Sequence, residues 1–125
     1  MKESNVILEK SMAFAIRIVN LYKYLNEEKH ENVMSKQLLR SGTSIGANAN
    51  EATQGQSRND FLAKMSISLK EVFETKYWLE LLYRTEYLTA DQYRSMEADC
   101  VEVMKILTNI IKSTKAVNEN DSRKK

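Results

Sequence analysis

Three carboxylates come nearest to forming a chemical site in this chain: Glu51 on one predicted helix, and Glu71 and Glu74 on the next. Inward carboxylates hold two iron ions in some helical bundles, but those sites also need Glu-x-x-His motifs on two helices. The one histidine, His30, lies in a polar connection without such a motif. We therefore expect no metal and no cofactor.

Cys100, the one cysteine, is the next candidate for chemistry. It lies on an apolar stripe, and no histidine is placed to activate it, so it is expected to be a small buried residue. A single cysteine forms no intrachain disulfide, which suits a reducing cytosol. No acid–base pair or oxyanion site can be assembled from the remaining residues. The sequence predicts a protein that is not an enzyme.

The segment 37–57 has helical spacing, almost no large side chain, and only two charges, Arg40 and Glu51. It contains Gly42-x-x-x-Gly46 but lacks the Gly-x-x-x-x-Gly-Lys pattern of a phosphate loop, and no strand precedes it. Small residues let helix backbones approach closely. We predict close helix packing at Gly42, Gly46 and Ala49.

The composition sets the context for these residues. The chain has 125 residues, no proline, three glycines and a formal net charge of +2. Alternating β-branched runs are missing, and the charge is far below that of a dedicated nucleic-acid binder. No basic-then-apolar leader and no long apolar run is found. We expect an all-α cytoplasmic protein with one domain.

Four helices are predicted, over about residues 5–28, 35–54, 57–87 and 89–117. Ser35 is a candidate N-cap, and Ser57–Asp60 and Thr89–Gln92 resemble capping boxes. The short connections favour an antiparallel up-down-up-down four-helix bundle over residues 1–117. The polar residues 118–125 are predicted to form a disordered tail.

The predicted helices differ in how many faces are apolar. In the third, Leu62, Met65, Leu69, Val72 and Phe73 form the expected core stripe. Ile67, Trp78 and Leu82 fall on the other side, and Met12, Ile16 and Val19 do so in the first helix. A second apolar surface favours a homo-oligomer; the alternative is simple exposure or cover by the connections. The predicted subunit interface is Arg40, Ala47, Glu51, Glu71, Glu74, Trp78 and Leu82.

Nucleic-acid binding is the remaining chemical option. Its candidate contacts are Lys23, Lys29, Lys36, Arg58 and Lys64, each with acidic residues nearby in the sequence. The alternative is an ordinary solvated surface of mixed charge. A ring of subunits would repeat a weak basic patch and multiply its affinity.

Several motifs resemble those of the bacterial four-helix-bundle proteins of the 23S rRNA intervening-sequence family. They are Leu38-Leu-Arg-Ser-Gly-Thr-Ser-Ile-Gly-Ala-Asn48 with Glu51, Ser57-x-x-Asp-Phe61, Lys64-Met-Ser-Ile-Ser-Leu-Lys-Glu71 and Glu74-Thr-Lys-Tyr-Trp-Leu79. The resemblance spans nearly the whole chain. Related accessory proteins of diversity-generating retroelements are similar to barrel-shaped homopentamers that bind nucleic acid. The resemblance therefore implies a ring, a pentamer, and a possible role with RNA or DNA.

Overall fold

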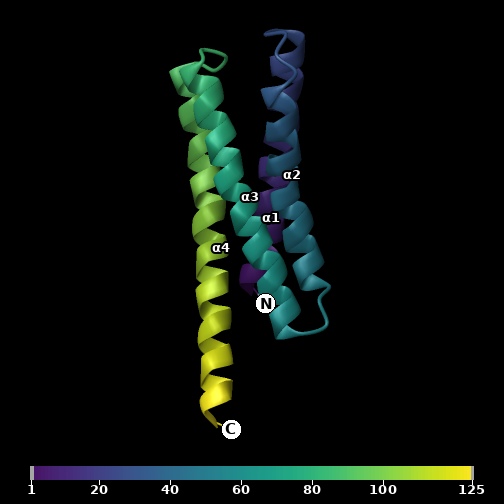
Figure 1. Cartoon of the computed structure of the whole chain (residues 1–125), viewed down its shortest axis with the longest axis vertical. Helices are drawn as coiled ribbons and strands as arrows, with labels where there is room; N and C mark the ends of the chain where they lie inside the picture. The colour runs from purple at the N-terminus through teal and green to yellow at the C-terminus, as the bar shows by residue number, and fades with distance from the viewer. Residues whose placement is uncertain (1, 125) are drawn as a thin grey trace.

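The structure, a computed structural model, describes residues 2–124 and the side chains of residues 4–120. It contains α1 (Lys2–Glu27), α2 (Met34–Thr53), α3 (Arg58–Arg84) and α4 (Ala90–Lys124), with no strand in this range. The α1–α2 and α3–α4 connections lie at one end and the α2–α3 connection at the other, so successive helices run antiparallel (Figure 1). The predicted all-α four-helix bundle is confirmed.

Each helix packs against two neighbours. The packed pairs are α1 with α2, α2 with α3, α3 with α4, and α4 with α1, while the Cα atoms of diagonal pairs stay more than 8 Å apart within the described residues. The bundle therefore has four outer faces, each formed by two adjacent helices. None of the helices in residues 2–124 is both long enough and apolar enough to cross a lipid bilayer.

Buried positions recur at alternating spacings of three and four residues in all four helices, which is the pattern of coiled-coil packing. A stripe of this period stays on one side of a helix that winds gently around its neighbours. The stripes are Ser4, Ile7, Ser11, Phe14, Ile18, Leu21 and Leu25 in α1; Ser35, Leu38, Gly42, Ile45, Ala49 and Ala52 in α2; Met65, Ser68, Val72, Thr75, Leu79 and Leu82 in α3; and Met96, Cys100, Val103, Leu107, Ile110 and Thr114 in α4.

The core stripe of α3 differs from the one that its apolar residues predicted. Leu82, expected on the outer side, is fully buried, whereas Phe73, expected in the core, is 55% exposed. Ser68 and Thr75 occupy two of the buried positions instead. The predicted stripe on α3 was drawn through apolar residues alone, and it is rotated about the helix axis relative to the side that faces the core. The predicted positions of Leu82 and Phe73 were therefore both wrong.

The small residues of α2 let α1 approach closely. A Cβ atom added at Gly42 would lie 2.7 Å from Ile18 Cγ1, and one added at Gly46 would lie 3.2 Å from Ser11 Oγ. Ala49 is also fully buried. These distances show that little more than a backbone fits between the two helices at Gly42.

Capping residues explain where three of the helices begin. Ser57 accepts a hydrogen bond from the Asp60 amide at the start of α3, and Thr89 and Gln92 form a reciprocal capping box before α4. Ser35, predicted as an N-cap, lies inside α2 instead. The N-cap position is Val33, and the capping hydrogen bonds come from Glu31, whose buried carboxylate accepts from the amides of residues 33–35 at 2.8–3.0 Å.

Helix α4 is the longest, with 35 residues against 27 in α3. Its backbone stays helical past Val117 as far as Lys124, where the sequence predicted a disordered tail over 118–125. Lys125 lies outside the described residues. Figure 1 shows the end of α4 projecting beyond the α2–α3 connection.

Candidate functional site

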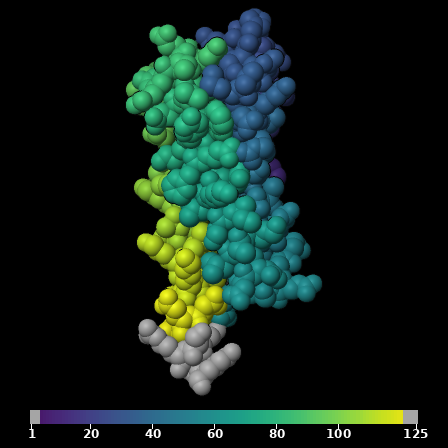
Figure 2. All heavy atoms as spheres, in the orientation of Figure 1, coloured from purple at the N-terminus to yellow at the C-terminus, as the bar shows by residue number. Residues whose placement is uncertain are grey.

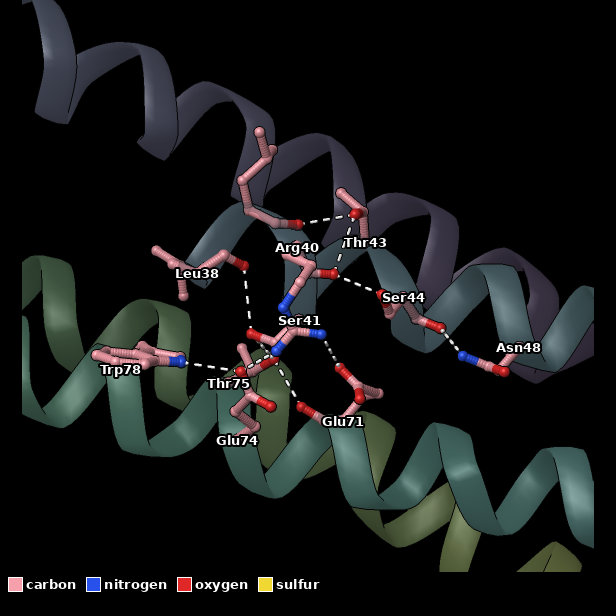
Figure 3. Close-up of polar contacts among 11 residues, drawn as sticks. Leu38, Arg40, Ser41, Thr43, Ser44, Asn48, Glu71, Glu74, Thr75 and Trp78 are labelled. Atoms are coloured by element: carbon pink, nitrogen blue, oxygen red, sulfur yellow. Dashed lines mark hydrogen bonds and ion pairs between the residues drawn. The ribbon is translucent and has the colours of Figure 1, made fainter. Parts of the chain in front are cut away.

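A cluster of charged side chains joins α2 to α3 (Figure 3). Arg40 reaches from α2 to two carboxylates on α3, at 3.2 Å from Glu71 Oε2 and in close contact with Glu74 Oε2. The indole N–H of Trp78 donates to the same Glu74 oxygen at 3.1 Å. The Glu74 carboxylate thus links the Arg40 guanidinium on α2 to the Trp78 indole on α3.

This arrangement stabilises the charged form of Glu74. The hydrogen bond from Arg40 lowers the pKa of Glu74 below its usual value, and the hydrogen bond from Trp78 lowers it further. Glu74 is therefore ionised at neutral pH and unsuited to donate a proton. The cluster can hold the two helices together but offers no general acid.

Beneath the charged cluster, buried hydroxyl groups join α2 to α3. The hydroxyls of Ser41 and Thr75 hydrogen-bond at 3.0 Å, and Ser68 Oγ donates to the Ile45 carbonyl at 2.7 Å. Every buried side-chain polar atom in the described residues has a partner. The polar residues in the core are thus satisfied internally, and none is directed at a ligand.

The structure separates the residues predicted to form the subunit interface into three groups. Four of them form ion pairs within the chain: Arg40 with Glu71 and Glu74, and Glu51 with Lys64 at 2.8 Å. Ala47 is exposed and Trp78 is half-buried, while Leu82 is fully buried and belongs to the hydrophobic core. The boundary between α2 and α3 is therefore bridged by ion pairs within the chain.

Large apolar side chains are exposed elsewhere on the bundle. On α1, Met12 is 56% and Ile16 is 55% exposed; on α3, Phe73 is 55% and Tyr77 is 58% exposed. The periodicity predicted the outward position of Met12 and Ile16, but it missed Phe73 and did not consider Tyr77. Figure 2 shows one side of the molecule, with α3 side chains filling the surface between those of α2 and α4.

The five candidate nucleic-acid contacts do not form one patch. Lys23, Lys29 and Lys36 are exposed near the α1–α2 connection. Arg58 and Lys64 lie near the α2–α3 connection at the opposite end, where Arg58 donates to Asn118 and Lys64 pairs with Glu51. The rise of α2 puts the two groups roughly 25 Å apart along the bundle.

The remaining candidate chemistry is weak. Cys100 is buried, and this burial raises the pKa of its thiol to about 12, so a thiolate is disfavoured. His30 is exposed in the α1–α2 connection, with a φ of 56°. Within the described residues no group of three or more histidine, cysteine or acidic side chains could hold a metal ion.

An open cleft of about 630 Å³ lies at the end of the bundle that holds the α2–α3 connection. Its wall combines small polar and apolar side chains from all four helices, with Arg58 as the one charged residue. Its lining residues include no histidine, cysteine or carboxylate, so no acid–base pair is formed there. The residues that line it are Ser4, Asn5, Leu8, Ala52, Thr53, Gln54, Gly55, Arg58, Phe61, Ser113, Thr114 and Val117.

Comparisons with known proteins agree on one family. The sequence model of the 23S rRNA-intervening sequence protein family matches residues 3–109. A crystal structure of a protein with unknown function from the S23 ribosomal protein family of Bacteroides thetaiotaomicron is 61% identical, with a TM-score of 0.87, over 88% of this chain and 98% of that chain. No curated protein matches.

Proposed function

This chain belongs to the 23S rRNA-intervening sequence protein family, and from that premise we propose that it is a cytoplasmic, non-enzymatic homo-oligomer that serves as a scaffold or binding module. The exposure of large apolar side chains on α1 and α3 is the observation that carries the proposal. Four such side chains (Met12, Ile16, Phe73 and Tyr77) are each more than half exposed. Clustered apolar surface on a small protein marks a site for a partner.

A second copy of the chain is the simplest partner, since it is present wherever the protein is. The resemblance to accessory proteins that form barrels of five copies supports a closed ring, a pentamer. The absence of an acid–base pair or metal cluster among the described residues is compatible with a binding role but does not carry the proposal.

The solution mass tests this function. Light scattering coupled to size-exclusion chromatography at micromolar concentration is expected to give a multiple of 14.5 kDa, and five copies for the pentamer. Native mass spectrometry gives the copy number independently. A single species of 14.5 kDa across the micromolar range would refute the proposal.

Nucleic-acid binding is the second candidate, favoured by the exposed Lys23, Lys29 and Lys36 at one end of the bundle. A ring would present one such group per copy on the same rim and so gain affinity through multivalency. The test is a salt titration of binding to single- and double-stranded RNA. Phosphate contacts give a linear fall of log K with log salt, and no detectable binding at low salt eliminates this role.

A further inference from the structure

The core of the bundle ends on small side chains next to the α2–α3 connection. Among the described side chains, the last buried positions at this end are Ser4 in α1, Ala52 in α2 and Thr114 in α4. One step deeper, α1 and α4 contribute Ile7 and Ile110, each at most 1% exposed. The end layer therefore holds less side-chain volume than the layer beneath it, and the cleft of about 630 Å³ opens there.

Apolar side chains form part of the wall of this cleft. Leu8 of α1 and Phe61 of α3 are partly buried against the core, and Val117 of α4 is 44% exposed. A ligand with an apolar body would remove the remaining surface of these side chains from water, which is favourable. The volume of the cleft also lies within the roughly 300–1,000 Å³ that is typical of small-molecule sites.

The polar side chains of the wall favour an anionic ligand. Arg58 at the start of α3 donates from Nη1 to Asn118 Oδ1 on α4 at 3.3 Å, which places its guanidinium between the two helices and beside Val117. A guanidinium carries five N–H donors, so it can serve a protein acceptor and a ligand carboxylate at the same time. The other polar lining residues are uncharged, and they are Ser4, Asn5, Thr53, Gln54, Ser113 and Thr114.

A second open cleft, of about 520 Å³, lies at the opposite end of the bundle and differs in character. Arg84 lines it together with Lys29 and Glu86, and Leu88 is its one aliphatic member. Arg84 also pairs with Glu80 at 3.4 Å. Of these two clefts, the one at the α2–α3 connection alone combines an apolar wall with a single cation and no lining carboxylate.

We propose that the cleft at the α2–α3 connection binds a small carboxylic acid whose apolar body is a ring system or a short chain. The carboxylate contacts Arg58, and the body lies against Leu8 and Phe61. A cationic ligand would be repelled by Arg58, and an uncharged one would form no ion pair with it. All of these residues belong to one chain, so each copy has its own site, and the inference goes beyond the proposed homo-oligomer.

Isothermal titration calorimetry of the full chain with 2-naphthoate tests the site, and octanoate tests whether a chain can replace the ring system. One binding site per 14.5 kDa chain is expected. The alcohol 2-naphthalenemethanol has the same ring system without the charge. It is expected to bind roughly fivefold more weakly than 2-naphthoate, which is the scale of one partly exposed ion pair.

Two variants separate the charge from the space. In Arg58→Gln, the preference for the acid over the alcohol is expected to disappear, a result that a loss of stability alone does not produce. Ser113 is exposed and lines the cleft, so Ser113→Trp is expected to fill the space and abolish the binding of both compounds.

Each variant has a matched control. Arg84→Gln removes an arginine from the second cleft, and Ala98→Trp adds a tryptophan at an exposed position of α4 that lines neither cleft. Both controls are expected to bind 2-naphthoate as the wild type does. Circular dichroism and thermal unfolding establish that all four variants are folded.

The outcomes decide the inference independently of the copy number. Wild-type protein that binds neither acid at millimolar concentration refutes it, and so does wild-type protein that binds the acid and the alcohol equally well. Unchanged binding by Ser113→Trp places the ligand elsewhere and overturns the site. A monomeric wild type that binds 2-naphthoate with the expected effects of both variants supports this inference while it refutes the proposed homo-oligomer.

Discussion

Replacing Gly42 by alanine tests how tightly α1 packs on α2. In a helix interior, alanine is favoured over glycine by about 1 kcal/mol. At this position, however, the new Cβ would lie 2.7 Å from Ile18 Cγ1 and 2.9 Å from both Cδ1 and Cγ2. Carbon atoms are in favourable contact at about 3.5–4.0 Å, so three clashes would have to be relieved at once.

The magnitude follows from these two opposing effects. Overpacking a core costs about 1–3 kcal/mol, and three clashes with a β-branched side chain place Gly42→Ala at the upper end of that range. After the gain in helix propensity, we expect a net destabilisation of about 1–2 kcal/mol. Gly46→Ala is the matched control, because its nearest contacts are Ser11 Oγ at 3.2 Å and Ser11 Cβ at 3.4 Å, both longer than any of the three at Gly42, so this variant is expected to be neutral or about 1 kcal/mol more stable.

Urea unfolding followed by circular dichroism measures both variants. All samples need the same protein concentration, because association raises apparent stability by mass action. A double-mutant cycle with Ile18→Ala identifies the clash: the cost of Gly42→Ala is expected to shrink by about 1 kcal/mol when Ile18 is truncated. If Gly42→Ala is as stable as Gly46→Ala, the close approach of α1 to α2 is refuted.

Three further predictions concern capping, ionisation and thiol reactivity. Glu31→Ala is expected to cost about 2 kcal/mol in urea unfolding, since three amides lose a carboxylate acceptor; an unchanged midpoint would contradict the capping role. The lowered pKa of Glu74 means that its pair with Arg40 stabilises the fold at neutral pH and loses this effect as pH falls below about 4.5. The difference in unfolding free energy between wild type and Arg40→Met is thus expected to be at most about 1 kcal/mol at pH 7 and to shrink towards pH 3; a difference that grows with acid would reverse the sign. With its pKa raised to about 12, the buried Cys100 is expected to react with a thiol reagent at pH 8 only at the rate of unfolding, whereas rapid labelling of the folded protein would show that the thiol is accessible.

Much of the architecture could be predicted because the local signals agree. Without proline, and with Ser57 and the Thr89–Gln92 pair before apolar periodic segments, the chain specifies helices and their starts. The start of α2 could not be read in the same way. Its N-cap position is Val33, and the capping carboxylate comes from Glu31, two residues earlier, a pattern that differs from the Ser/Thr/Asp/Asn preference on which the choice of Ser35 rested.

The phase of α3 was the main failure, for an identifiable reason. The core positions of Ser68 and Thr75 accept hydroxyl groups because partners on α2 satisfy them. The periodicity of apolar residues cannot reveal a buried serine or threonine, because the group that satisfies its hydroxyl lies on another helix. The recurrence of three- and four-residue spacings, counted with small polar residues included, would have identified the buried Leu82 and the exposed Phe73.

The sequence predicted which residues form the charged cluster between α2 and α3, but not that they pair within a single chain. Sequence reasoning placed Arg40 and Glu74 on facing stripes and considered a contact between subunits. The structure joins them within one chain, where Arg40 reaches from α2 to both Glu71 and Glu74 on α3. Whether an ion pair forms within one chain or between two copies depends on the distances between helices, and a single sequence does not give these distances.

The length of α4 would give the proposed homo-oligomer a direction. With 35 residues, α4 spans roughly 52 Å, whereas α3 with 27 spans roughly 40 Å. In a ring of level, parallel copies, every projecting α4 end belongs to one rim, and the two short connections that follow α1 and α3 belong to the other. A molecule approaching along the ring axis would therefore contact the C-terminal ends of α4 on one side, and the α1–α2 and α3–α4 connections on the other.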